Sequence, residues 1–142
     1  MLTGISALTL ATHNMARALA FYRGLGFVLK YGGPDARFSS LHAGSGYLNL
    51  MQMPAETTWN WWGRAIFYVD DVDAFTARAV AAGATVRMPV SDMFWGDRYG
   101  QLDDPFGHRW SIATRLKDLS PRELQKRASE FNAEYQTKNA QG

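Results

Sequence analysis

Residues 7–26, which read ALTLATHNMARALAFYRGLG, have a counterpart of the same pattern at 64–83, RAIFYVDDVDAFTARAVAAG. Each segment opens with alternating side chains, which is typical of a strand with one buried face, and continues into a helical pattern. Asn14 and Asp71 stand at equivalent places and suit helix N-caps, whereas Gly26 and Gly83 suit helix ends. The shared cap, end and order indicate an internal repeat of a strand followed by a helix.

Three short strand candidates follow each of these units. They cover 27–31, 36–42 and 46–51 in the first half and 84–88, 98–103 and 108–113 in the second. The turn sequences GGPD, AGSG, PVSD and DPFG separate them. The sequence therefore predicts an α+β domain over 1–114, built from a βαβββ module at about 4–53, a linker at 54–63 and a second βαβββ module at about 64–114.

The C-terminal segment, 115–142, is predicted to be a helix and a tail. Ser120 suits an N-cap, Pro121 the first helical position and Glu123 the third, which is the pattern of a capping box. An apolar stripe follows to about residue 136, because apolar residues recur every three or four positions at Leu124, Ala128, Phe131 and Tyr135. We expect this helix to pack on the domain or on a second subunit.

Composition excludes several classes of protein. The 142 residues include no cysteine, so disulfides and thiolate chemistry are excluded, which fits a cytoplasmic location. No apolar run is long enough to span a membrane, and the N-terminus lacks the basic start of a secretory signal. The net charge is only +2, without a block of Lys and Arg that would follow a nucleic-acid backbone, so no nucleic-acid partner is expected.

Three motifs carry a family resemblance: FYRGLGF at 21–27, VDDVDAF at 69–75 and DDPFGHRWSI at 103–112. Together with the paired modules they resemble the vicinal oxygen chelate superfamily, which includes glyoxalase I, extradiol dioxygenases, fosfomycin-resistance enzymes and bleomycin-resistance proteins. The resemblance covers roughly residues 4–114. It implies that the two modules curl into one cup-shaped mixed sheet, of the glyoxalase/bleomycin-resistance type, around a single ligand site.

The resemblance also implies four positions for metal ligands, on the first and last strands of each module. Metal-dependent members usually have His, Gln or Glu there. The corresponding residues in this sequence are Ala7, Asn49, Arg64 and Ser111. None is a usual ligand of a divalent ion, and the fixed positive charge of Arg64 repels a cation. We therefore expect no metal and no other cofactor.

Strand alternation indicates which side chains line the cup, because side chains that do not pack on the helices face the other way. His42 at the end of its strand suits the cup, and alternation places eight further residues there: Tyr47, Asn49, Met51, Arg64, Ile66, Tyr68, Arg109 and Ser111. The Trp-rich stretches WNWW (59–62) and MFWGDRY (93–99) flank the cup and add further candidates. The predicted ligand-binding residues are His42, Tyr47, Asn49, Met51, Trp62, Arg64, Tyr68, Trp95, Arg98 and Ser111.

An aromatic cup with few polar groups suits a neutral or anionic, hydrophobic or aromatic small molecule. The first hypothesis is a metal-free binding protein that sequesters such a compound, for example a drug. Family members of that kind commonly build the groove between two subunits, which implies a homodimer. The alternative is a metal-independent isomerase or lyase that uses Tyr47, Tyr68, Arg64 or His42. A third reading is a metal-dependent glyoxalase or dioxygenase, against which the four ligand positions argue. No residue is assigned as catalytic.

Overall fold

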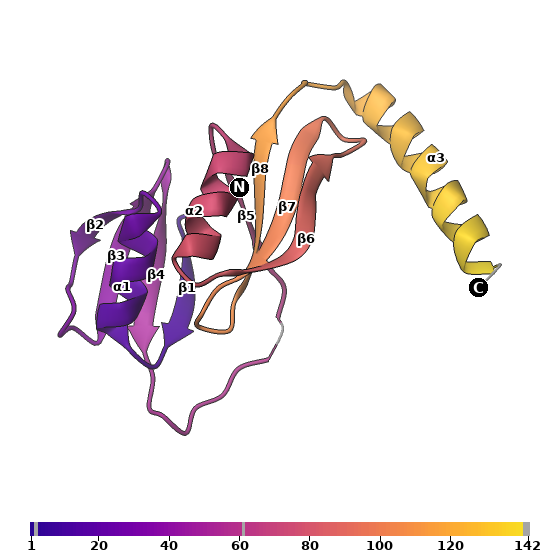
Figure 1. The fold of residues 1–142 in the computed structure, drawn as a ribbon. Coiled ribbons are helices and arrows are strands. Elements are labelled where there is room, and N and C mark those ends of the chain that lie inside the picture. Colours follow the sequence, from indigo (N-terminus) through magenta and orange to yellow (C-terminus); the bar gives the residue numbers. More distant parts are fainter. Residues whose placement is uncertain (2, 61, 141–142) are drawn as a thin grey trace.

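The computed structural model describes residues 1, 3–60 and 62–140. Its first module consists of β1 (Ala7–Thr12), α1 (Met15–Gly24), β2 (Val28–Tyr31), β3 (Phe38–Ala43) and β4 (Gly46–Gln52). The second consists of β5 (Ala65–Tyr68), α2 (Val72–Ala81), β6 (Thr85–Asp92), β7 (Asp97–Asp103) and β8 (Arg109–Arg115), and α3 (Pro121–Ala140) follows. Figure 1 shows the two modules side by side, with α3 extending from the second. The predicted α+β fold of two βαβββ modules is confirmed.

Both modules have the same sheet topology. The strand orders are β1-β4-β3-β2 and β5-β8-β7-β6, and the first strand of each module runs parallel to the last. Among the described residues, the eight strands therefore make two four-stranded sheets, in which β1 and β5 are edge strands.

The two predicted helix N-caps of the repeat are confirmed. The side chain of Asn14 accepts a hydrogen bond from the backbone amide of Arg17 at 3.1 Å, and that of Asp71 accepts one from Ala74 at 3.1 Å. Each cap satisfies an amide that the first helical turn leaves without a partner.

One hydrophobic core joins the two modules. The inner faces of both sheets contribute to it, with Leu48 and Leu50 on β4 and Trp110 and Ile112 on β8, and both helices pack against these side chains. Because neighbouring strand residues point to opposite faces, the other face of each sheet points away from this shared core. We call these the first open face, which includes His42, Tyr47, Asn49 and Met51, and the second open face, which includes Arg64, Ile66, Tyr68, Tyr99 and Ser111.

Asp104, in the DPFG turn, ties the modules together inside the core. One carboxylate oxygen accepts hydrogen bonds from the backbone amides of Phe106 and His108, each at 2.9 Å. The other accepts from the indole of Trp110 at 2.9 Å and from the hydroxyl of Tyr22 on α1. Burial and the neighbouring Asp104 carboxylate raise the pKa of Tyr22 well above its ordinary value, so the phenol keeps its proton. The motifs FYRGLGF and DDPFGHRWSI thus meet in space.

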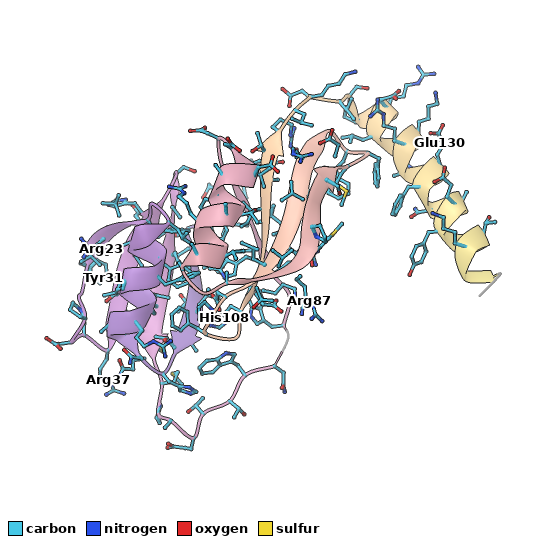
Figure 2. The ribbon with its side chains drawn as sticks, viewed as in Figure 1. Arg23, Tyr31, Arg37, Arg87, His108 and Glu130 are labelled. Atoms are coloured by element: carbon cyan, nitrogen blue, oxygen red, sulfur yellow. The ribbon has the colours of Figure 1, made fainter. Side chains whose placement is uncertain are left out.

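The described contacts of the C-terminal helix with the second module lie between its start and Phe131. Ser120 accepts from the amide of Glu123 at 3.1 Å, as the capping pattern predicts, and the ring of Phe131 lies 5.0 Å from that of Phe94. Beyond that contact Phe131 and Tyr135 remain exposed, and Figure 2 shows Glu130 on a part of α3 that stands away from the modules. The helix runs to Ala140, past the expected end near 136. No helix among the described residues is long and apolar enough to cross a membrane.

Candidate functional site

The first open face combines aromatic rings with neutral polar groups. The rings of His42 and Tyr47 lie 5.4 Å apart, and the ammonium of Lys30 lies 3.9 Å above the Tyr47 ring. The amide of Asn49 donates to the hydroxyl of Thr9 at 3.4 Å. Met51 completes the face and is 42% exposed. A surface of this kind offers stacking and apolar contact, with an amide and a cation at its edges.

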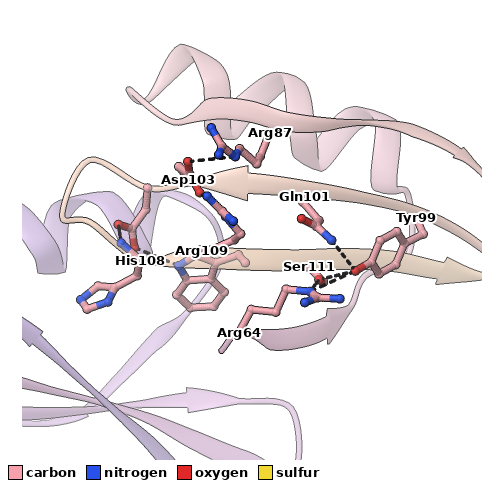
Figure 3. A network of polar contacts seen from close by, with 10 residues as sticks. Arg64, Arg87, Tyr99, Gln101, Asp103, His108, Arg109 and Ser111 are labelled. Carbon is pink, nitrogen blue, oxygen red and sulfur yellow. Dashed lines mark hydrogen bonds and ion pairs between the residues drawn. The ribbon is translucent and has the colours of Figure 1, made fainter. Parts of the chain in front are cut away.

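The second open face contains a polar network around Arg64 (Figure 3). The Nε group of Arg64 donates to the hydroxyl of Ser111 at 2.6 Å and to that of Tyr99 at 3.2 Å. The two hydroxyls lie 2.5 Å from one another, and the amide of Gln101 donates to Tyr99 at 3.1 Å. Tyr99 and Ser111 are buried, whereas Arg64 is exposed above them. The guanidinium is therefore held over a floor of two buried hydroxyls.

This network changes the acidity of Tyr99. Burial alone would raise the pKa of its phenol, but the hydrogen bonds with Ser111, Gln101 and Arg64 outweigh that effect and lower the pKa below its ordinary value. The positive charge of Arg64 acts in the same direction. Negative charge is thus stabilised at this point of the second open face.

Tyr68 lies beside the network at the rim of the same face. Its hydroxyl donates to the carboxylate of Asp97 at 3.0 Å, and the indole of Trp95 donates to the same oxygen at 2.9 Å. Arg115 pairs with the other oxygen of Asp97 at 2.6 Å. These bonds fix the hydroxyl end of Tyr68, although the residue is 57% exposed. Its ring is therefore a pre-positioned surface for stacking.

The structure brings most of the predicted site residues onto the two open faces, but in two groups. His42, Tyr47, Asn49 and Met51 lie on the first sheet; Arg64, Tyr68, Trp95 and Ser111 lie on or beside the second. Trp62 lies apart, in a groove of the linker with Trp59, Asn60, Gly63, Asp103, Gly107, His108 and Arg109. Trp61 lies outside the described residues.

Arg98 is placed away from both groups. It alternates with Tyr99 along β7 and so reaches the helix side of the sheet, where it pairs with Asp73 of α2 at 2.7 Å and with Asp92 at 2.9 Å. Tyr99 and Gln101, which were not among the predicted residues, lie in the network around Arg64 and Ser111 instead. Strand alternation could have placed them on this face, because Gln101 lies opposite Ser111 in the ladder between β7 and β8.

The residues at the family's metal positions do not fit a metal ion. Arg64 directs its Nε group at Ser111, so a fixed positive charge lies next to the oxygen that would have to bind the ion. Ala7 has no donor atom, and Asn49 offers only a neutral amide. In the described part of the chain, no group of three or more His, Asp or Glu side chains is arranged to hold a metal.

Comparison with known proteins agrees with this fold. A model of the Glyoxalase/Bleomycin resistance protein/Dioxygenase superfamily matches residues 4–112. TioX from Micromonospora sp. ML1 is 28% identical, with a TM-score of 0.64 over 80% of this chain and 100% of its own. The fosfomycin resistance protein FosX from Listeria monocytogenes is 18% identical, with a TM-score of 0.69 over 89% of this chain and 99% of its own.

An uncharacterized protein of Mycobacterium tuberculosis is 49% identical over 57 residues. That match covers 40% of this chain and 34% of the relative, so most of the relative lies outside it. The family model, by contrast, covers most of the present chain, including both modules and all three motifs. The chain therefore belongs to the Glyoxalase/Bleomycin resistance protein/Dioxygenase superfamily.

Proposed function

We propose that this protein binds a hydrophobic or aromatic small molecule without a metal ion. One observation carries the proposal. Arg64 and Ser111 stand at two of the positions that hold metal ligands in metal-dependent members, and they are hydrogen-bonded to each other. The same face exposes the ring of Tyr68. Such a face recognises a ligand by stacking, apolar contact and hydrogen bonds. Drug sequestration is one use of such a site, and the resistance proteins in the family support it.

The site requires a second copy of the chain. Within one chain the two open faces point away from the shared core, so they cannot enclose one ligand. Met51 on the first face and Ile66 and Tyr68 on the second are 42%, 55% and 57% exposed, so each face offers apolar surface that a second copy can cover. A homodimer that places the first open face of each copy against the second open face of its partner encloses two equivalent cups. The edge strands β1 and β5 suit a seam between the copies.

A fluorescence titration tests ligand binding. The probe is 8-anilinonaphthalene-1-sulfonate, an aromatic anion, and we expect it to bind at micromolar concentration with a chelator present. Tyr68→Ala should weaken binding by about 1 kcal/mol or more, because the stacking surface is lost. Tyr135→Ala, which removes an exposed tyrosine from α3, is the matched control and should leave the affinity unchanged. Binding that needs added metal, or an equal effect of both variants, would contradict the proposed function.

A further inference from the structure

Arg64 differs from the other arginines of the second open face. Arg109 pairs with Asp103 at 2.9 Å, and Arg115 pairs with Asp97 at 2.6 Å. Arg64 makes no ion pair within the described residues, and its hydrogen bonds go to two neutral hydroxyls. The face therefore carries one positive charge that no described carboxylate balances. A charge in this position attracts an anion, and the attraction grows when a ligand and a second subunit exclude water.

The geometry of Arg64 leaves its outer edge available. Both of its hydrogen bonds use the Nε group, so the two terminal nitrogens have no partner in the described part of the chain. The bond to Ser111 holds the guanidinium in place before any ligand arrives, which reduces the ordering needed on binding. A planar fork of N–H donors matches the two oxygens of a carboxylate.

The hydroxyl floor can supply a further donor. One hydrogen bond between Tyr99 and Ser111 uses one of their two hydroxyl protons. With Gln101 oriented to donate to Tyr99, and Arg64 donating to both oxygens, the second hydroxyl proton has no acceptor among the described residues. A ligand oxygen next to Arg64 would accept that proton in a hydrogen bond. Such an acceptor is favoured because a buried donor without a partner is costly.

We infer that Arg64, Tyr99 and Ser111 form a carboxylate-binding subsite that orients an aromatic acid in the cup. This inference rests on the proposed function, because the aromatic part of the ligand lies over Ile66 and Tyr68. Ile66 stands directly opposite Ser111 in the ladder between β5 and β8, so the apolar surface and the subsite adjoin. The lowered pKa of Tyr99 agrees with a positive environment at this point. The subsite takes the place of metal coordination in fixing the ligand's orientation.

The test compares cinnamate with cinnamamide, two ligands of the same shape of which only the first carries a carboxylate. Isothermal titration of the full chain should give cinnamate at least about a tenfold lower dissociation constant, as expected for charge-assisted hydrogen bonds. Arg64→Gln should remove this preference. Tyr99→Phe, which keeps the ring and removes the hydroxyl, should reduce it severalfold. Arg87→Gln is the control, since Arg87 lies on β6 with only a 4.0 Å contact to Asp103, and it should keep the full preference.

The outcomes separate the subsite from the proposed function. Equal affinity for both compounds in the unchanged protein, or a preference that survives Arg64→Gln, would overturn the carboxylate subsite and leave aromatic binding intact. Failure of both compounds and of the naphthalene probe to bind would overturn the subsite together with the proposed function. Circular dichroism of each variant confirms that a lost preference reflects the site and not the fold.

Discussion

Asp104→Ala is expected to lower the free energy of unfolding by about 4 kcal/mol, because the change leaves several buried donors without an acceptor. Four groups donate to this carboxylate: the Tyr22 hydroxyl, the Trp110 indole and the backbone amides of Phe106 and His108. Asp104 itself is buried. The substitution therefore removes the polar tie between α1 and the second module. Urea denaturation followed by circular dichroism measures the effect.

Asp103→Ala is the matched control for this change. The side chain of Asp103 is 34% exposed and pairs with Arg109 at 2.9 Å at the protein surface. Its loss should lower the free energy of unfolding by about 1 kcal/mol or less, as is usual for exposed ion pairs. If the two variants were equally stable, Asp104 would not hold the modules together in the way the structure indicates.

Gly96→Ala is expected to lower the free energy of unfolding by about 3 kcal/mol, through strain and a clash with the backbone. Gly96 has φ of +97°, which favours glycine, and an added Cβ would lie only 2.2 Å from the carbonyl oxygen of Lys117. The carbonyl of Gly96 also accepts from the amides of Leu116 and Lys117. The change would therefore displace the segment that leads from β8 into α3.

Gly24→Ala provides the comparison. Gly24 is the last residue of α1, has no positive φ, and an added Cβ there would meet nothing within 4 Å. Because alanine favours the helix and restricts the unfolded chain, we expect a gain of about 0.5 kcal/mol. In thermal and urea unfolding, the midpoint should fall for Gly96→Ala and rise for Gly24→Ala. A loss of stability of similar size in both variants would contradict this difference between the two glycines.

The parts of the fold that depend on neighbours in sequence could be predicted. Asn14 and Asp71 cap their helices by contacts three residues away, as the sequence predicts. The strand and helix of each repeat could also be predicted, because the spacing of apolar residues within each segment is a local pattern. The family motifs at 21–27 and 103–112 then indicated how the modules continue.

The arrangement of the two open faces could not be predicted from these patterns. Alternation separates the two faces of a strand, but it does not say whether two sheets share their inner or their outer faces. That choice depends on contacts distant in sequence, such as those of Tyr22 with Asp104 and of Phe27 with Phe67. Without the register of β7 against β8, Arg98 was proposed for the site, whereas its neighbour Tyr99 lies against Ser111.

We propose that two copies of the chain enclose a small molecule that side chains, not a metal ion, hold in place. Native mass spectrometry of the protein, purified without added metal and loaded with cinnamate, tests it in one spectrum. We expect a dimer of the 15.9 kDa chain that carries the aromatic acid and no divalent ion. A complex that retains one divalent ion for each bound acid, or a monomer that carries the acid, would contradict it.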